Sequence, residues 1–365
     1  MSYGAPSIAA FPGAGIPVRR IAVVRALYLG DLLLAVPALR ALRTRYPQAE
    51  ITLIGLPWAE AFTRRIATYV DRFVAFPGYP GIVEEAYDPI RTKRFLREQR
   101  AYGYDLVLQM HGSGTASNGF ALALGGRVTS GYYVGAPPDG LGPSAPYPDR
   151  EPEVLRNLGL ARLVGCRCLD DTLAFPLLAE DHAEARALLR DLTGVAPIIG
   201  IHAGARAPSR RWPPERFAEL ADALSGHFGA RIVLSGTADD TPVALAIRSH
   251  MRYTPLDLTG KTSLGGLAAV IERMSLFIGN DSGPAHLAEA VGTPSVTLFG
   301  PTDPRRWAPL DGGAHPIVRQ PVACNPCAYA ECPIDHRCLR RITPVMVLER
   351  ASELLQAKGA TACGA

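Results

Sequence analysis

Residues 276–304 read LFIGNDSGPAHLAEAVGTPSVTLFGPTDP and carry the strongest signal for the architecture of the chain. The apolar run at 276–278 indicates a buried strand, and turn-forming residues follow it at 279–284. A helix is expected over 285–291, because a glycine and a proline come directly after it. A second strand, 295–299, ends in another loop. This order predicts an α/β fold in which both loops lie at the carboxyl edge of a parallel sheet.

The loop before the helix is suited to an anion. A helix that begins at Ser282 and Gly283 directs free backbone N–H groups and its positive dipole end toward the loop, which favours a phosphate or diphosphate. Asp281 and Ser282 are also good capping residues. The residues alone therefore leave phosphate binding and helix capping as alternatives.

Residues 281–304 resemble the C-terminal signature of glycosyltransferase family 9, the heptosyltransferase family. Three further segments agree, at residues 20–42, 200–224 and 258–264, and the resemblance extends over about residues 20–352. A motif of this length, with fixed Asp, Gly, His and Gly-Pro-Thr-Asp-Pro positions, is more specific than an isolated glycine pattern. The resemblance implies a GT-B architecture, in which two Rossmann-like α/β domains face each other across a cleft.

The implied domain plan has five parts. They are a disordered tail at 1–17, an acceptor-binding domain at 18–168, a linker at 169–180, a nucleotide-sugar-binding domain at 181–343, and a helix at 344–358 that packs back on the first domain. The tail lacks a basic segment before a long apolar run, so a signal peptide is not expected. No apolar run is long enough to predict a transmembrane helix. The proline-rich residues 137–152 are expected to form a loop.

The composition is that of an ordinary soluble globular chain. Of 365 residues, 48% are hydrophobic and 20% are charged, and the formal net charge is +4. No block of like charge occurs, so a nucleic-acid partner is not expected.

The segment RIAVVRALYLGDLLLAVPALRAL, residues 20–42, resembles the opening of family 9. It predicts a strand, a loop and a helix over 32–46 with Pro37 in its first turns. The loop lacks G-x-G-x-x-G, which disfavours a nicotinamide dinucleotide site. The family's catalytic base corresponds to Asp31, although Tyr28 replaces the usual serine. Without the resemblance, Asp31 would be interpreted as the N-cap of the helix.

The resemblance places the acceptor on the first domain, near Arg25, His111 and Ser113. His111 directly follows a predicted strand, YDLVLQM. It could position or deprotonate an acceptor hydroxyl, or it could be a hydrogen-bonded structural histidine.

The segment GIHAGARAPSRRWPPERFAELADAL, residues 200–224, is also similar to the family. Its phosphate-contacting lysine corresponds to Arg210, next to Arg211, and a guanidinium can hold a diphosphate with two parallel hydrogen bonds. A carboxylate after the next strand suits a ribose, with Asp240 preferred to Asp239, although an acidic residue at a helix start is the alternative. The full predicted donor site comprises Gly204, Arg210, Arg211, Asp239, Asp240, Asp281, Ser282, Gly283 and His286.

Four cysteines follow in CNPCAYAECPIDHRC: Cys324, Cys327, Cys332 and Cys338. Their spacing makes a metal site a weak candidate, and unpaired thiols or a disulfide are the alternatives. No D-x-D motif is placed to hold a metal and diphosphate. We therefore expect chemistry that needs no metal or other cofactor.

The function implied by the resemblance is sugar transfer with inversion. The donor is a nucleotide sugar such as ADP-heptose, and the acceptor is a lipopolysaccharide-like or lipid-linked glycan. The expected location is the cytoplasm, with peripheral contact at the inner membrane. Two alternatives stay open: a nucleotide-sugar 2-epimerase of the same architecture, and a non-catalytic sugar-nucleotide-binding protein. The oligomeric state is not predicted.

Overall fold

The computed structural model describes residues 17–167, 170–192 and 194–362, with the backbone alone for 358–362. The predicted tail therefore lies outside the described residues except for Pro17, and so does the predicted domain end at Cys168.

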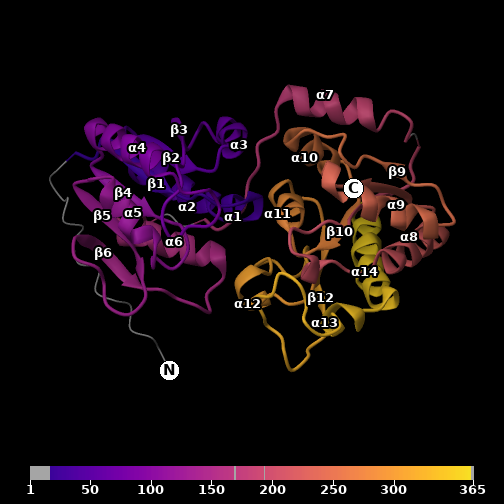
Figure 1. Ribbon diagram of the computed structural model, residues 1–365. Coiled ribbons are helices and arrows are strands. Elements are labelled where there is room, and N and C mark those ends of the chain that lie inside the picture. Colours follow the sequence, from indigo (N-terminus) through magenta and orange to yellow (C-terminus); the bar gives the residue numbers. More distant parts are fainter. Residues whose placement is uncertain (1–16, 168–169, 193, 363–365) are drawn as a thin grey trace. The chain divides into compact units, whose positions relative to one another are not determined.

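The chain divides into two compact units, Met1–Thr172 and Leu173–Ala365 (Figure 1). The division falls inside the segment predicted as a linker, 169–180. Each unit is built on one six-stranded parallel sheet.

The first unit has the strand order β3-β2-β1-β4-β5-β6. Its strands are β1 (Arg20–Val24), β2 (Glu50–Gly55), β3 (Arg72–Ala75), β4 (Leu106–Gln109), β5 (Val128–Tyr133) and β6 (Leu141–Pro146). The four residues after Arg20 in β1 are all buried. This continuous apolar run is typical of a central parallel strand with both faces covered.

One strand of this sheet, β6, lies in the stretch 137–152 that was expected to be a loop. That expectation is wrong for Leu141–Pro146. β6 is the edge strand of the sheet and pairs with β5 alone, so its prolines remove no hydrogen bond from a second neighbour.

The helices of the first unit are α1 (Leu29–Leu33), α2 (Val36–Arg45), α3 (Ala59–Arg65), α4 (Pro89–Tyr102), α5 (Ser117–Ala123) and α6 (Glu153–Leu163). The single helix predicted over 32–46 is two helices, interrupted at Leu34 and Ala35. Pro37 lies in the first turn of α2, where its missing N–H is tolerated. The interruption makes α1 a separate short helix that carries Asp31.

The second unit repeats the same plan, with the order β12-β11-β10-β7-β8-β9. Counted along the chain within each unit, both sheets have the order 3-2-1-4-5-6 of a Rossmann fold. The strands are β7 (Ile198–His202), β8 (Arg231–Ser235), β9 (Leu256–Asp257), β10 (Leu276–Asn280), β11 (Ser295–Phe299) and β12 (Ile317–Arg319).

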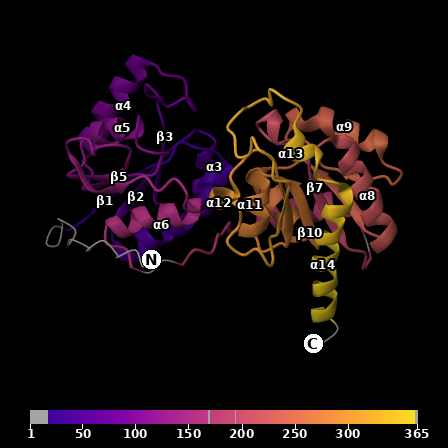
Figure 2. The same ribbon diagram turned by 90° about the horizontal axis from the view of Figure 1, so that it is seen from below.

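The helices of the second unit cover both faces of its sheet; α11 and α8 lie on opposite sides of β10 (Figure 2). The unit contains α7 (Ala179–Leu188), α8 (Pro214–Phe228), α9 (Thr241–His250), α10 (Leu264–Glu272), α11 (Gly283–Ala290), α12 (Pro304–Trp307), α13 (Arg337–Arg340) and α14 (Pro344–Ala362). Two 3₁₀ turns, η1 (Pro208–Arg210) and η2 (Ala238–Asp240), follow β7 and β8.

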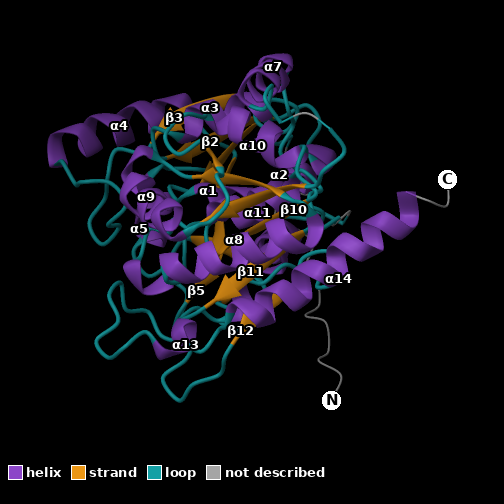
Figure 3. Cartoon of the chain, turned by 90° about the vertical axis from the view of Figure 1, so that its right-hand side faces the viewer, coloured by secondary structure: helices purple, strands orange, loops and turns teal. Residues whose placement is uncertain are grey.

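The last helix, α14, was expected to pack on the first domain. Within its own unit, this helix packs on α8, β10 and β11 (Figure 3). Val347 and Ala351 of this helix are fully buried in the core that Trp212 and Phe217 share. Burial of these apolar residues explains why α14 belongs to the second unit.

None of the helices in the described part of the chain is both long and apolar enough to span a membrane.

Candidate functional site

The order in which successive strands are added reverses at one point of each sheet, between β1 and β4 in the first unit and between β7 and β10 in the second. Ligands of open α/β sheets bind beside the carboxyl ends of the strands at such a point. The loops that follow these four strands hold most of the predicted site residues.

In the first unit, Asp31 lies in the first turn of α1, after the β1 loop. The N-cap of this helix is Tyr28, so Asp31 does not occupy the capping position. The side chain of Asp31 is 22% exposed, and its Oδ1 lies 3.9 Å from the nearest guanidinium nitrogen of Arg25. A partly exposed carboxylate beside a fixed positive charge can accept a proton from a bound hydroxyl.

Arg25 was expected to contact the acceptor, and in the structure its side chain is engaged within the protein. Its side chain is 1% exposed, so it cannot present its charge to a large glycan. Its Nε donates to the main-chain oxygen of Asp31 at 2.7 Å, and one Nη donates to the carbonyl of Met110 at 2.5 Å. Arg25 is therefore an internal support that joins the loops after β1 and β4.

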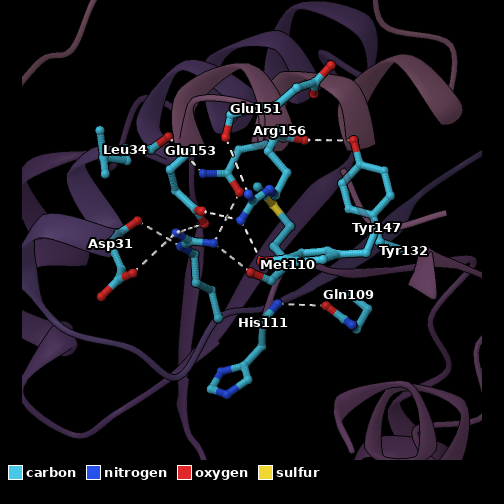
Figure 4. A network of polar contacts seen from close by, with 12 residues as sticks. Asp31, Leu34, Gln109, Met110, His111, Tyr132, Tyr147, Glu151, Glu153 and Arg156 are labelled. Atoms are coloured by element: carbon cyan, nitrogen blue, oxygen red, sulfur yellow. Dashed lines mark hydrogen bonds and ion pairs between the residues drawn. The ribbon is translucent and has the colours of Figure 1, made fainter. Parts of the chain in front are cut away.

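Three residues of α6 complete this network (Figure 4). Glu153 and Asn157 accept hydrogen bonds from Arg25 at 3.2 and 3.1 Å. Arg156 donates to the second oxygen of Glu153 at 2.7 Å. All three are less than 5% exposed. The sequence analysis missed them, although their i, i+3 and i+4 spacing places three polar side chains on one helix face, which is a recognisable signal.

His111 and Ser113 follow β4, as predicted from the strand YDLVLQM. The Nε2 of His111 lies 3.6 Å from a carboxylate oxygen of Glu84, and its buried Nδ1 has no hydrogen-bond partner among the described residues. Burial lowers the pKa of His111 to about 4, against the opposing charge of Glu84. The imidazole is thus neutral at pH 7. The hydroxyl of half-buried Ser113 is 3.0 Å from that of Thr115.

In the second unit, Asp281 follows β10 and is 5% exposed. Its carboxylate accepts a hydrogen bond from Thr302 at 2.5 Å and lies 3.6 Å from a guanidinium nitrogen of Arg210. Arg210 is 39% exposed, so part of its guanidinium group faces solvent. The neighbouring Arg211 donates to the carbonyl of Ala205 at 2.8 Å. The two arginines therefore differ, and only Arg210 is paired with the β10 loop.

The helix α11 begins beside these charges, with Ser282 as its N-cap and Gly283 as its first residue. The Ser282 side chain does not cap the helix; its hydroxyl donates to the carbonyl of Asn280 at 3.2 Å. His286, one turn along, is buried, and its Nδ1 has no hydrogen-bond partner in the described structure. Burial lowers the pKa of His286, an effect that Asp281 opposes and Arg210 reinforces.

Asn280 is a site residue that the sequence analysis did not identify. It is completely buried; its amide donates to the carbonyl of Ala203 at 2.8 Å and accepts from the N–H of Trp212 at 3.1 Å. These two bonds join the β10 loop to both ends of the 203–212 loop. Asn280 thereby fixes the loop that carries Arg210.

The two candidate ribose carboxylates have different environments. Asp240 is 9% exposed and accepts hydrogen bonds at 2.9 Å from the N–H and hydroxyl of Thr237, which closes the first turn of η2. A side-chain carbon at Gly204 would lie 2.5 Å from the Asp240 carboxylate, so only glycine fits there. Asp239 is exposed beside them. The structure therefore gives Asp240 the helix-start role and leaves Asp239 accessible.

The four-cysteine loop lies against the 3₁₀ turn η1. Ser209 donates its hydroxyl to the carbonyl of Tyr329 at 2.7 Å and its N–H to that of Ala330 at 3.0 Å. Cys324, Cys327, Cys332 and Cys338 line a pocket with Ser209 and Pro301, and all four are unpaired thiols. Within the described ranges, no group of three or more His, Cys, Asp or Glu side chains is arranged to hold a metal ion. The metal candidate thus gains no support.

Known proteins resemble this chain in both sequence and fold. The sequence model of glycosyltransferase family 9 (heptosyltransferase) matches residues 92–337. Lipopolysaccharide heptosyltransferase 2 of Salmonella typhimurium is 28% identical over 366 residues, which covers 93% of this chain and 99% of that protein.

Two solved structures share the architecture. The family 9 glycosyl transferase from Veillonella parvula superposes with a TM-score of 0.76 at 22% identity, covering 93% of this chain and 98% of its own. The ADP-heptose lps heptosyltransferase II of E. coli gives 0.71 at 24% identity, covering 93% and 99%. The fold is that of the GT-B class, as predicted.

Proposed function

The chain belongs to glycosyltransferase family 9, and from that premise we propose that it is an inverting heptosyltransferase. Its donor would be ADP-heptose, and its acceptor a lipopolysaccharide-like glycan met at the cytoplasmic face of the inner membrane. The observation that carries this proposal is the placement of Asp31. This partly exposed carboxylate lies at the carboxyl end of β1, where an internal guanidinium holds its loop.

In the proposed reaction, the acceptor hydroxyl oxygen forms a bond to the anomeric carbon while the bond from that carbon to the diphosphate oxygen breaks. Asp31 takes the proton of the hydroxyl. The nucleoside diphosphate leaves with the electron pair, and attack from the opposite side inverts the anomeric centre. A positioned base of this kind accelerates transfer by about 10²–10⁴-fold.

The second unit would hold the donor. The solvent-facing part of Arg210 and the N–H groups at the start of α11 can bind the diphosphate and stabilise its charge as it leaves. Asp281 and Thr302 would fix the orientation of that guanidinium. The unpartnered Nδ1 of His286 is a further polar group for the donor pocket.

Asp239 is our preferred ligand for the ribose hydroxyls, because it is exposed while Asp240 is engaged by Thr237. This choice reverses the order expected from the sequence. Gly204 then contributes by making room for Asp240 and not by touching the ligand.

For the acceptor, His111 and Ser113 are the proposed contacts of the first unit, and Arg25 acts only from within. A neutral His111 can accept a hydrogen bond from a sugar hydroxyl.

The names of the relatives support heptose as the transferred sugar. The Salmonella protein is a lipopolysaccharide heptosyltransferase, and the E. coli structure is that of an ADP-heptose enzyme. Neither the 2-epimerase nor the non-catalytic alternative is the activity for which the matched family is named.

The test is a transfer assay with ADP-heptose and a deacylated inner-core lipopolysaccharide. We expect a glycosylated product and free ADP in equal amounts with the parent chain. ADP release without the acceptor, or epimerised donor as the main product, would contradict the proposal.

A further inference from the structure

We propose that Glu153 and Asn157 of α6 are positioning residues for the transfer: they hold Arg25, and through it they place Asp31. This inference rests on the proposed role of Asp31 as the base. It assigns α6 a role in catalysis, although the side chains of Glu153 and Asn157 are buried and cannot contact a substrate.

The first step of the argument is the geometry of the Arg25 guanidinium. Its Nε donates to the main-chain oxygen of Asp31 at 2.7 Å, while an Nη lies 3.9 Å from the carboxylate of the same residue. The short contact is therefore to the backbone, and the longer one is to the reactive group. Arg25 therefore fixes the backbone from which the Asp31 side chain extends, but it does not form a short ion pair with the carboxylate.

The second step is the source of the counter-charge. A guanidinium that is 1% exposed requires a nearby anion, because burial of an unpaired charge is costly. Glu153, itself 4% exposed, lies 3.2 Å from Arg25 and supplies that anion. Since Glu153 is the short partner, the Asp31 carboxylate is not required to be the counter-ion of Arg25.

The third step is the clamp on α1. The side-chain oxygen of Asn157 accepts from Arg25 at 3.1 Å, and its amide donates to the carbonyl of Leu34 at 2.9 Å. Leu34 is the C-cap of the five-residue helix that contains Asp31. One asparagine thus touches the end of α1 directly, and it touches the Asp31 turn through Arg25.

The fourth step is the anchorage of α6 itself. Arg156 donates to Glu153 at 2.7 Å and to the carbonyl of Pro148 at 3.0 Å, and its guanidinium stacks 4.3 Å from the Tyr147 ring centroid. Figure 4 shows Glu153 and Arg156 close to each other, with the imidazole of His111 directed away from them. The support for Asp31 is therefore a closed network and not a single contact.

The consequence is kinetic. A misplacement of about 1 Å in a reacting group can lower the rate roughly 100-fold. Replacement of Glu153 by glutamine keeps the shape but removes the charge, which leaves Asp31 as the nearest anion for Arg25. The carboxylate is then drawn toward Arg25 and becomes a weaker base.

The test compares Glu153→Gln and Asn157→Ala with the parent full-length chain in the ADP-heptose transfer assay. We expect kcat to fall about 10–100-fold in each variant, with the KM for the donor changed less than threefold. In Glu153→Gln, the acid limb of the pH–rate profile should move to lower pH. In an Asp31→Asn background, neither substitution should cause a further loss.

Asp222→Asn is the matched control. Asp222 is a carboxylate of the second unit, 5% exposed, that accepts the N–H groups of Arg252 and Tyr253. Its replacement should lower stability while kcat and the pH profile stay those of the parent. An equal loss of kcat in this control would show that destabilisation alone explains the effect, and would overturn the inference.

The outcomes separate the inference from the proposed function. Full activity of Asp31→Asn would show that Asp31 is not the base, which overturns the proposed mechanism together with the inference that rests on it. An inactive Asp31→Asn together with parental kcat in the α6 variants, or with multiplicative losses in the double variants, overturns the positioning role alone. If Glu153→Gln does not fold, the uncharged substitution Asn157→Ala decides the question by the same kcat and double-variant criteria.

Discussion

The two units share one strand order, yet the same point of each sheet is built in opposite ways. Behind the β1 loop, the first unit places a buried ionic network in which Arg25 is held by Glu153 of a distant helix. Behind the β7 loop, the second unit places the neutral, fully buried Asn280, and its charged Arg210 remains 39% exposed. A shared scaffold therefore supports two different chemistries.

The difference indicates a division of labour. A charge that is fixed internally can orient a carboxylate without competing for the substrate, which suits proton transfer. An exposed guanidinium on a loop fixed by neutral hydrogen bonds suits recognition of an anion. We therefore expect substitutions in the first unit to change the chemical step, and those in the second to change donor affinity.

The largest effect should come from Asp31→Asn. Asparagine keeps the size of the side chain but cannot take the proton, so kcat should fall about 10²–10⁴-fold. Chemical denaturation should give a free energy of unfolding close to that of the parent. Activity within threefold of the parent, in a folded variant, would make His111 the next candidate for the base.

Arg210→Ala should weaken binding of ADP by about 10–100-fold, because charge-assisted hydrogen bonds to a phosphate are lost. Arg211→Ala is the matched control, since that guanidinium donates within its own loop to Ala205. Its affinity for ADP should change less than threefold. Isothermal titration calorimetry on both variants makes the comparison, and equal effects would break the distinction between the two arginines.

Asn280→Ala should lower the free energy of unfolding by about 1–3 kcal/mol, because the carbonyl of Ala203 and the N–H of Trp212 lose buried partners. The same substitution should weaken ADP binding, since the loop that carries Arg210 is no longer fixed. Urea denaturation and calorimetry measure the two effects. Unchanged stability would show that Asn280 does not support the loop.

Each unit also carries a buried histidine whose pKa burial lowers to about 4: His111 after β4, and His202 at the end of β7. Between pH 6.5 and 4 the unfolded chain binds protons at these positions that the folded chain does not. The stability that these two neutral histidines contribute is therefore fully present above about pH 6.5, and it is lost as the pH falls toward 4.

The measurement is denaturation at pH 7.5 and pH 5.5. His111→Gln should reduce the loss of stability between these values by about 1 kcal/mol relative to the parent. A pH dependence identical to that of the parent would mean that His111 is protonated normally in the folded chain.

The smallest effect is expected from the four-cysteine loop. Dialysis against a chelator should leave transfer unchanged within error, because the proposed scheme uses only side chains and backbone N–H groups of this chain. An activity that disappears with the chelator and returns with zinc would instead identify Cys324, Cys327, Cys332 and Cys338 as a structural metal site.

Much of this organisation can be predicted from the sequence, because central parallel strands form continuous apolar runs and their loops contain turn-forming residues. The α/β class and the position of Asp31, Arg210 and Asp281 after the carboxyl ends of strands follow from such local signals. The proline-containing edge strand β6 gives no such signal, since its one-sided pairing depends on the completed sheet.

The supports of the site are harder to predict because they depend on distant contacts. Glu153 lies 128 residues along the chain from Arg25, and Asn280 lies 68 residues from Trp212. A buried arginine and an acceptor-binding arginine look the same in one sequence. The proposed exchange of roles between Asp239 and Asp240 has the same origin, since only the folded turn shows which carboxylate Thr237 engages.

The division of labour is tested most directly by the affinity of the Asp31→Asn variant for ADP-heptose, measured by isothermal titration calorimetry. If the first unit performs the chemistry and the second holds the donor, the dissociation constant should stay within threefold of the parent value while transfer is lost. A dissociation constant that rises in parallel with the loss of transfer would contradict the account, because Asp31 would then be a donor-binding residue.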